Sequence, residues 1–79
     1  MGVTEDLADA LAKDTIEAAE ATGDERLIDE VAKQLGASSQ TTQEAYMTAV
    51  RVRLSEKRAR AFLQEKLKDF LAEQKAQKG

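Results

Sequence analysis

Apolar residues recur at helical spacing through the first quarter of the chain. At about 100° per residue, one broad face of a helix collects Val3, Leu7, Ala8, Leu11, Ala12, Thr15, Ile16 and Ala19. Thr4 is a suitable N-cap, because its hydroxyl can accept a hydrogen bond from a free N–H of the first turn. Gly23 is a suitable left-handed C-cap. The pattern therefore predicts a helix over residues 4–21.

A second stretch is shorter and carries a narrower apolar stripe. The residues at the i, i+3 and i+4 spacing are Leu27, Ile28, Val31, Ala32 and Leu35. Asp24 can cap the start of this helix, and Gly36 marks its predicted stop. We therefore expect a helix over residues 24–35, followed by a polar loop over residues 37–40.

The third stretch stays helical in pattern from Thr41 to Ala76 and contains no glycine or proline. Thr41 and Glu44 fit a capping box, in which each side chain satisfies a free N–H near the other residue. Thr42 and Ser39 are alternative caps for the same helix start. This stretch is long enough for one helix of about 50 Å or for two shorter helices.

The apolar stripe of the third stretch changes sides partway along. Tyr46, Met47, Val50, Leu54 and Ala61 cluster on one side of the helix. The opposite side collects Ala59, Phe62, Leu63, Leu67, Phe70 and Leu71. The change spans the wholly polar segment 55–58. Either the helix bends or breaks near Ser55 and folds back as a fourth helix, or it runs straight and its second half meets another chain.

These elements predict an all-α fold in one domain, residues 1–79. The expected architecture is a three-helix bundle with a long C-terminal helix, bent or broken near Ser55 in the four-helix alternative. The expected helices cover 4–21, 24–35, 41–54 and 56–76, the last two continuous in the three-helix form, and residues 77–79 form a frayed tail. The expected core consists of Leu7, Leu11, Ile16, Leu27, Ile28, Val31, Leu35, Tyr46, Val50 and Leu54.

Composition narrows the chemistry that the chain can carry. It has no cysteine and no histidine, which excludes thiol catalysis, histidine-based triads and the usual zinc ligand sets. Its acidic residues show no calcium-loop spacing, and no glycine-rich phosphate loop is present. We therefore expect no enzyme activity, no cofactor and no metal site. No apolar run approaches the ~20 residues of a membrane span, and the acidic start lacks a secretory pattern, which predicts a cytoplasmic protein.

Charge is divided unevenly along the chain. Residues 1–30 hold ten acidic and two basic residues, and residues 31–79 hold five acidic and ten basic residues. The formal charges of −8 and +5 invite either internal pairing of the two parts or two different partners. The candidate phosphate contacts lie in the basic segment and are Arg51, Arg53, Lys57, Arg58 and Arg60. The acidic overall charge and the scarcity of aromatic residues nearby disfavour nucleic-acid binding.

Several positions in the first half are similar to a known family. Ala12-Lys13, Ala19, Gly23-Asp24-Glu25, Val31 and Leu35 resemble part of the alphaproteobacterial ATP synthase zeta subunit, a small helical inhibitor of the F1 motor. The resemblance covers roughly residues 8–50. It implies a bacterial protein with a bundle of three or four helices that works by contacting another protein. The family's N-terminal inhibitory segment has no counterpart in this sequence, so no functional residue is transferred.

The sequence thus predicts a non-catalytic protein-interaction or regulatory module. Its candidate partner interface consists of Phe62, Leu63, Leu67, Phe70 and Leu71, because buried aromatic residues dominate interface energetics. The expected partner is another protein or a second copy of the chain, and no membrane contact is expected. The alternative function is a nucleic-acid-binding protein that uses the basic segment 51–60.

Overall fold

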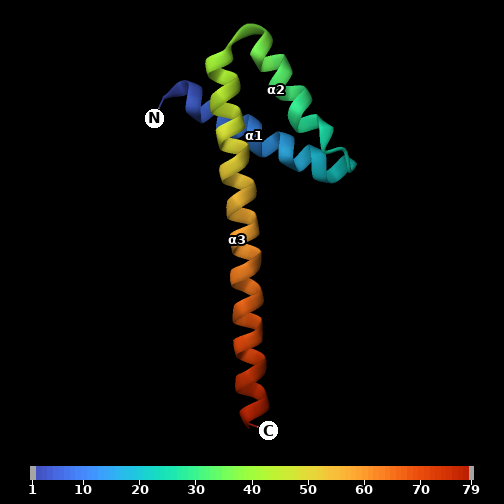
Figure 1. The fold of residues 1–79 in the computed structure, drawn as a ribbon, viewed down its shortest axis with the longest axis vertical. Helices are drawn as coiled ribbons and strands as arrows, with labels where there is room; N and C mark the ends of the chain where they lie inside the picture. Colours follow the sequence, from blue (N-terminus) through green and yellow to red (C-terminus); the bar gives the residue numbers. More distant parts are fainter. Residues whose placement is uncertain (1, 79) are drawn as a thin grey trace.

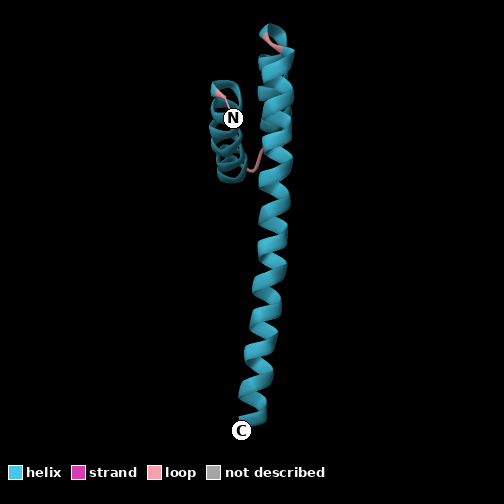
Figure 2. Ribbon diagram, turned by 90° about the vertical axis from the view of Figure 1, so that its left-hand side faces the viewer, coloured by secondary structure: helices cyan, strands magenta, loops and turns pink. Residues whose placement is uncertain are grey.

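The structure, a computed structural model, describes residues 2–78 and consists of three helices over that range (Figure 1). They are α1 (Val3–Thr22), α2 (Arg26–Ser38) and α3 (Gln40–Lys78). Together α1, α2 and the first part of α3 form a triangle, and the rest of α3 extends from it without another helix alongside (Figure 2). The all-α class and the long C-terminal helix are confirmed.

Helix α1 begins one residue before the predicted N-cap. The N–H of Asp6 donates to the carbonyl oxygen of Gly2 at 3.0 Å, so the first helical turn is already closed at Val3. Gly2 is therefore the N-cap residue, without a side-chain cap, and the prediction of Thr4 in that role is wrong. The other end is as expected, because Gly23 adopts φ 73° and its N–H donates to the carbonyl oxygen of Ala19.

Helix α2 starts beside the predicted cap but ends later than expected. The Asp24 carboxylate accepts a hydrogen bond from the N–H of Arg26 at 3.1 Å. Gly36 lies inside the helix, which continues to Ser38, so the predicted stop at Gly36 is wrong. The physical reason is packing, since a Cβ on Gly36 would lie 2.6 Å from the side-chain nitrogen of Gln43 on α3. This glycine allows a close approach between α2 and α3.

Helix α3 is capped by Ser39, one of the alternatives that the sequence left open. The Ser39 hydroxyl accepts a hydrogen bond from the N–H of Thr42 at 3.1 Å. The helix then continues through Ser55 to Lys78, so the predicted alternative of a break and a fourth helix is wrong. No helix breaker lies in this stretch, and an ion pair between Glu56 and Arg60, one turn apart, spans the segment where the stripe changes sides.

The core lies inside the triangle and is centred on Tyr46, whose side chain is fully buried. Small residues of α1, Ala8 and Ala12, pack against it together with Ala32 and Val50. Small side chains allow the helix axes to approach closely, which brings the large ring of Tyr46 into contact with all three helices. The partly buried apolar residues around this cluster are Leu11, Ile28, Val31, Leu35, Ala45, Met47, Ala49 and Leu54.

The predicted core is mostly confirmed. Every member except Leu7 is buried or half-buried, including Ile16 and Leu27 outside the central cluster. Leu7 is 65% exposed, and its prediction as a core residue is wrong. Ala8 and Ala12 occupy the line of closest contact on α1, and this line leaves Leu7 at the solvent side. The broad apolar face of this helix therefore exceeds the area that α2 and α3 cover.

This packing divides the molecule into two parts. We call residues 2–54 the head, because Leu54 is the last residue of α3 that is even half-buried. We call residues 55–78 the tail, which at 1.5 Å per residue is ~36 Å long. The side chains of residues 55–76 are all exposed, and the molecule measures 62 × 30 × 13 Å along its principal axes.

Candidate interaction site

The five residues of the candidate partner interface lie together on the tail. Their side chains are between 54% and 65% exposed although all of them are large and apolar. We call this set the apolar strip, and its members are Phe62, Leu63, Leu67, Phe70 and Leu71. At 100° per residue the strip covers about half of the helix circumference. Scattered exposed leucines are ordinary, whereas five large apolar side chains gathered on one side of a helix make this strip a candidate interaction site.

The centre of the apolar strip is turned away from the side of α3 that packs in the head. Tyr46 and Val50 define the packed side, and Leu63, at the centre of the strip, lies about 120° around the helix from their mean direction, whereas Leu71, at one edge of the strip, lies about 40° from it. Val52 shares the direction of the strip and is 61% exposed, although it lies within the head. Its distances of 11 and 18 residues from Leu63 and Phe70 correspond to nearly whole numbers of helical turns. That spacing was the signal in the sequence, and the sequence-based interface omitted Val52.

Charged residues of both signs lie within and beside the apolar strip. The ammonium group of Lys66 lies over the ring of Phe62, 5.6 Å from its centroid. At 100° per residue, Lys66 and Glu73 both lie between the directions of Phe62 and Phe70. Asp69 follows Phe62 by seven residues on nearly the same line, and Glu65 and Lys68 lie on the opposite side of the tail. The tail is thus an amphipathic helix whose polar side is mixed in charge rather than uniformly basic.

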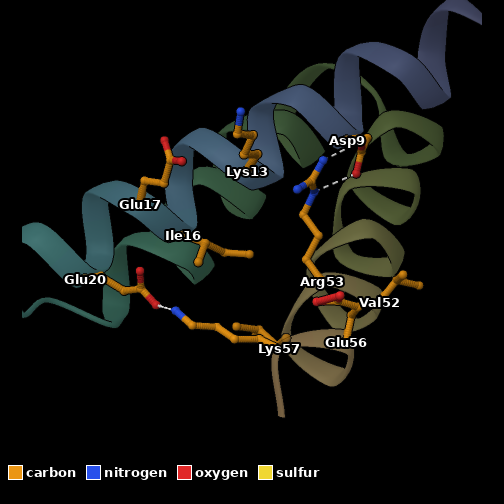
Figure 3. A pocket seen from close by; sticks show the side chains of 10 residues that line it. Asp9, Lys13, Ile16, Glu17, Glu20, Val52, Arg53, Glu56 and Lys57 are labelled. Atoms are coloured by element: carbon orange, nitrogen blue, oxygen red, sulfur yellow. Dashed lines mark hydrogen bonds and ion pairs between the residues drawn. The ribbon is translucent and has the colours of Figure 1, made fainter. Parts of the chain in front are cut away.

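Arg53 of the basic segment forms an ion pair with α1. Its guanidinium donates two hydrogen bonds of 2.7 Å to the carboxylate oxygens of Asp9, a bidentate pair (Figure 3). This hydrogen bonding lowers the pKa of Asp9 below its ordinary value of 3.8 and raises that of Arg53. The pair bridges 44 positions of the chain and joins the acidic helix α1 to the basic part of α3.

Lys57 and Arg60 also have carboxylate partners. Lys57 forms an ion pair with Glu20 at the other end of α1 (Figure 3). Arg60 donates to Glu56 on its own helix at 2.6 and 2.9 Å, and this lowers the pKa of Glu56. Within residues 2–78, Arg51 and Arg58 form no ion pair.

The five candidate phosphate contacts therefore do not form one patch. Arg51 and Arg58 are seven residues apart and lie on one line of the helix. Arg53, Lys57 and Arg60 lie on a different side, and carboxylates neutralise all three. A phosphate group at Arg53 or Lys57 has to displace the carboxylate of Asp9 or Glu20.

An open groove of about 540 Å³ runs between α1 and α3 beside these ion pairs. Arg53 and Lys57 reach across it from α3 (Figure 3), and Ile16 and Leu54 are among the apolar residues that line it. A second groove of about 580 Å³ shares Ile16 and Leu54 and lies toward Gly23 and Ile28. Two of the basic side chains that line the first groove, Arg53 and Lys57, bind carboxylates of the same molecule. This arrangement explains how α1 is fastened to α3 and leaves the apolar strip as the stronger candidate site.

Comparison with protein-family models, with curated proteins and with solved structures gave no match. The resemblance to ATP synthase zeta subunits therefore stays a prediction from the sequence. Across residues 2–78, no helix combines the length and the apolar character that crossing a membrane requires. The function is consequently inferred from the geometry of the head and the tail.

Proposed function

We propose that this protein is a non-catalytic interaction module, in which the head fixes one end of α3 and the tail presents the apolar strip to a protein partner. The observation that carries the proposal is the exposure of five large apolar side chains on one side of a continuous helix. Water contact of so many Leu and Phe side chains is unfavourable, and burial of each contributes ~1.5–3 kcal/mol. Since α1 and α2 are engaged in the head, neither of these helices covers the strip.

The shape of the molecule supports this role. Presentation of an amphipathic helix to a groove or to another helix is a recurrent mode of peptide recognition, and its anchors recur at the i, i+3, i+4 and i+7 positions. Leu63, Leu67 and Phe70 follow this spacing, with Leu71 beside them. A tail that is already helical also loses less conformational entropy on binding than a segment that folds on contact.

The alternative of nucleic-acid binding receives less support. Its candidate contacts point in different directions, and Arg53 and Lys57 are already paired with carboxylates of α1. Loss of these ion pairs disfavours phosphate binding, because each new contact replaces an existing one. The acidic residues of α1 also repel a phosphate backbone that approaches this side of α3.

Photo-crosslinking in the cells of origin tests the proposal. A photoreactive phenylalanine derivative at position 70 is expected to form a covalent adduct with a protein, because Phe70 lies in the apolar strip. The matched control is the same derivative at position 68, because Lys68 is also on the tail but faces away from the strip. Adducts at position 70 and few at position 68 support the proposal. Absence of protein adducts at position 70, or equal adducts at both positions, contradicts it.

A further inference from the structure

The occupant of the apolar strip can be identified from the residues that border it. We propose that it is the apolar strip of a second copy of this chain, with the two tails antiparallel and Leu67 of each copy against Phe70 of the other. This inference rests on the proposed function, because it requires that the strip binds protein. It adds the identity of the partner, the direction of the two helices and their register.

The spacing of residues along the tail shows which side chains can meet between the two copies, and we call this line of contact the seam. Leu63, Leu67, Phe70 and Gln74 follow one another at intervals of four, three and four residues, which is the a/d spacing of a coiled coil. A two-fold axis midway between positions 68 and 69 places Leu67 against Phe70 of the second copy in two central layers. Leu63 then lies against Gln74 of the second copy, which closes each end of the apolar seam with a polar residue.

Charge complementarity selects this register and direction. Leu67 and Gln74 occupy the a positions of this spacing. Lys66 and Glu73 directly precede them, so these two charges lie seven residues apart on the same edge of the seam. In the antiparallel register each Lys66 lies beside Glu73 of the second copy, so that one dimer contains this ion pair twice. In a parallel pair with the same seam, Lys66 instead lies beside Leu71 of the second copy and both charges lose their partner.

Repulsion between the heads also favours the antiparallel arrangement. Residues 1–30 carry a formal charge of −8, and parallel tails bring two such regions side by side. In the antiparallel register, Leu54 of each copy is ~22 Å from the two-fold axis along the helix, so the heads are ~44 Å apart. This distance exceeds the Debye length of ~10 Å at ordinary salt concentrations, so the repulsion is screened.

The size of the apolar strip predicts how tightly the copies bind. Four side chains of the strip face the seam, and they are Leu63, Leu67, Phe70 and Leu71. Each is more than half exposed, and together they present on the order of 400 Å² of apolar surface, within the range of the largest patch found on monomers. A stable complex of standard size buries ~800 Å² on each partner. The apolar area is thus sufficient for the centre of an interface, and we expect a reversible dimer whose population depends on concentration.

A lipid surface fits the same strip less well. Helices that lie on membranes have Lys and Arg along the polar side and an uncharged apolar side. In the tail, Glu65 interrupts the polar side next to Lys68, and Asp69 and Glu73 lie on the Phe62 side of the strip, where lipid would have to cover two carboxylates. The acidic helix α1 is also repelled by anionic headgroups. We therefore argue for the second copy and treat vesicle binding as an outcome of the test.

Sedimentation equilibrium of the full chain over a range of concentrations measures the association. The expected mass rises from 8.7 kDa toward twice that value as concentration increases. Lys66→Glu and Glu73→Lys each replace two attractive contacts by two repulsive ones, and we expect each to raise the dissociation constant about 10-fold. The double variant restores opposite charges and is expected to bind within about threefold of the natural chain. Lys68→Glu, away from the seam, is the matched control and should change little.

Disulfide trapping tests the direction independently, because the chain contains no cysteine of its own. A mixture of Leu63→Cys and Gln74→Cys chains should form a mixed disulfide, since these positions face each other in the antiparallel register. Each variant alone should remain reduced, because position 63 of one copy is ~16 Å along the axis from position 63 of the other. Rapid disulfide formation by Leu63→Cys alone indicates a parallel pair and overturns the proposal.

Other outcomes separate this inference from the proposed function. A chain that stays at 8.7 kDa at millimolar concentration, yet forms adducts with a different protein through position 70, overturns self-association and leaves the interaction module intact. If the double variant Lys66→Glu/Glu73→Lys binds no more tightly than either single variant, the register is overturned. Binding to anionic vesicles that is lost in Leu67→Asp/Phe70→Asp, without self-association, assigns the strip to a lipid surface. A mixed disulfide together with charge-exchange recovery supports the proposal.

Discussion

The hydroxyl of Tyr46 donates a hydrogen bond to the backbone carbonyl oxygen of Ile28 at 3.0 Å, and this contact joins α3 to α2 across 18 positions of the chain. The Tyr46 ring is fully buried against Ala8 and Ala12 of α1. One side chain therefore contacts all three helices. A small domain has a thin core, and loss of this residue removes a large share of it.

Substitution of Tyr46 separates the hydrogen bond from the packing. Tyr46→Phe keeps the ring and is expected to lower the free energy of unfolding by about 1 kcal/mol, the usual value of one hydrogen bond. Tyr46→Ala also leaves a cavity and is expected to lower it by about 3–5 kcal/mol. Denaturant unfolding followed by circular dichroism measures both. Equal losses in the two variants contradict the central position of the ring.

Burial raises the pKa of the Tyr46 hydroxyl above its ordinary value of 10.0. Because the folded state holds this proton more tightly than the unfolded state, the associated stability is fully present below pH 10.0 and decreases as the pH rises through the raised value. Thermal unfolding between pH 8 and pH 11.5 should show this decrease. Tyr46→Phe is the control, because it cannot ionise and should lose less stability over the same interval.

The ion pair between Asp9 and Arg53 predicts an acid-side effect of opposite sign. The pKa of Asp9 is below 3.8 because Arg53 donates hydrogen bonds to the charged carboxylate. The stability associated with this group is present above pH 3.8 and is lost as the pH falls through the lowered value. Carboxyl chemical shifts in an NMR titration should show the lowered pKa, which Arg53→Gln moves back toward 3.8. Arg51→Gln is the matched control and should leave the titration of Asp9 unchanged.

A methyl group at Gly36 should disturb a specific neighbour. Gly36→Ala gains up to ~1 kcal/mol of helix propensity, but its Cβ displaces the Gln43 amide that donates to the carbonyl oxygen of Ala32 at 2.9 Å. Loss of that bond offsets the gain by a similar amount. The double-mutant cycle with Gln43→Ala is therefore informative. Gln43→Ala should cost about 1 kcal/mol in the natural chain and much less beside Ala at position 36. Equal costs in both backgrounds contradict the contact.

The apolar strip is expected to contribute nothing to the folding stability of the head. Phe70→Asp should change the free energy of unfolding by less than about 0.5 kcal/mol, as for other exposed positions. The measurement requires concentrations at which the natural chain and the variant have the same mass, since association stabilises the folded state. A loss comparable to that of Tyr46→Ala places Phe70 in the core and contradicts the division into head and tail.

The sequence predicted correctly those structural features that depend on interactions between residues close together in the chain. The left-handed cap at Gly23 and the periodic face with Tyr46 and Val50 depend on neighbours within a few residues, and both are confirmed. The same local reasoning predicts a stop at Gly36. The role of Gly36 depends instead on Gln43 of the next helix, and the pattern of α2 alone does not contain this contact. Periodicity also predicts Leu7 in the core, because it gives the direction of a side chain but not the width of the surface that covers it.

The candidate site was predictable in part. The change of stripe direction after Leu54 correctly located the exposed residues of the tail, although one of its two interpretations, the break near Ser55, is wrong. A helix that lacks glycine and proline continues into solvent without a neighbour when its propensity is high enough. The pairing of Arg53 with Asp9 and of Lys57 with Glu20 could not be read from the sequence, because it depends on the angle at which α1 crosses α3.

The continuity of α3 also makes the tail a lever. The same helix that carries Tyr46 in the core carries Leu67 and Phe70 at the far end, without a joint between them. If the axis of α3 tilts by about 10° within the head, the end of the ~36 Å tail moves by about 6 Å. Small changes in the packing of alanines in the head are therefore magnified at the strip, where they alter which surface the tail can reach.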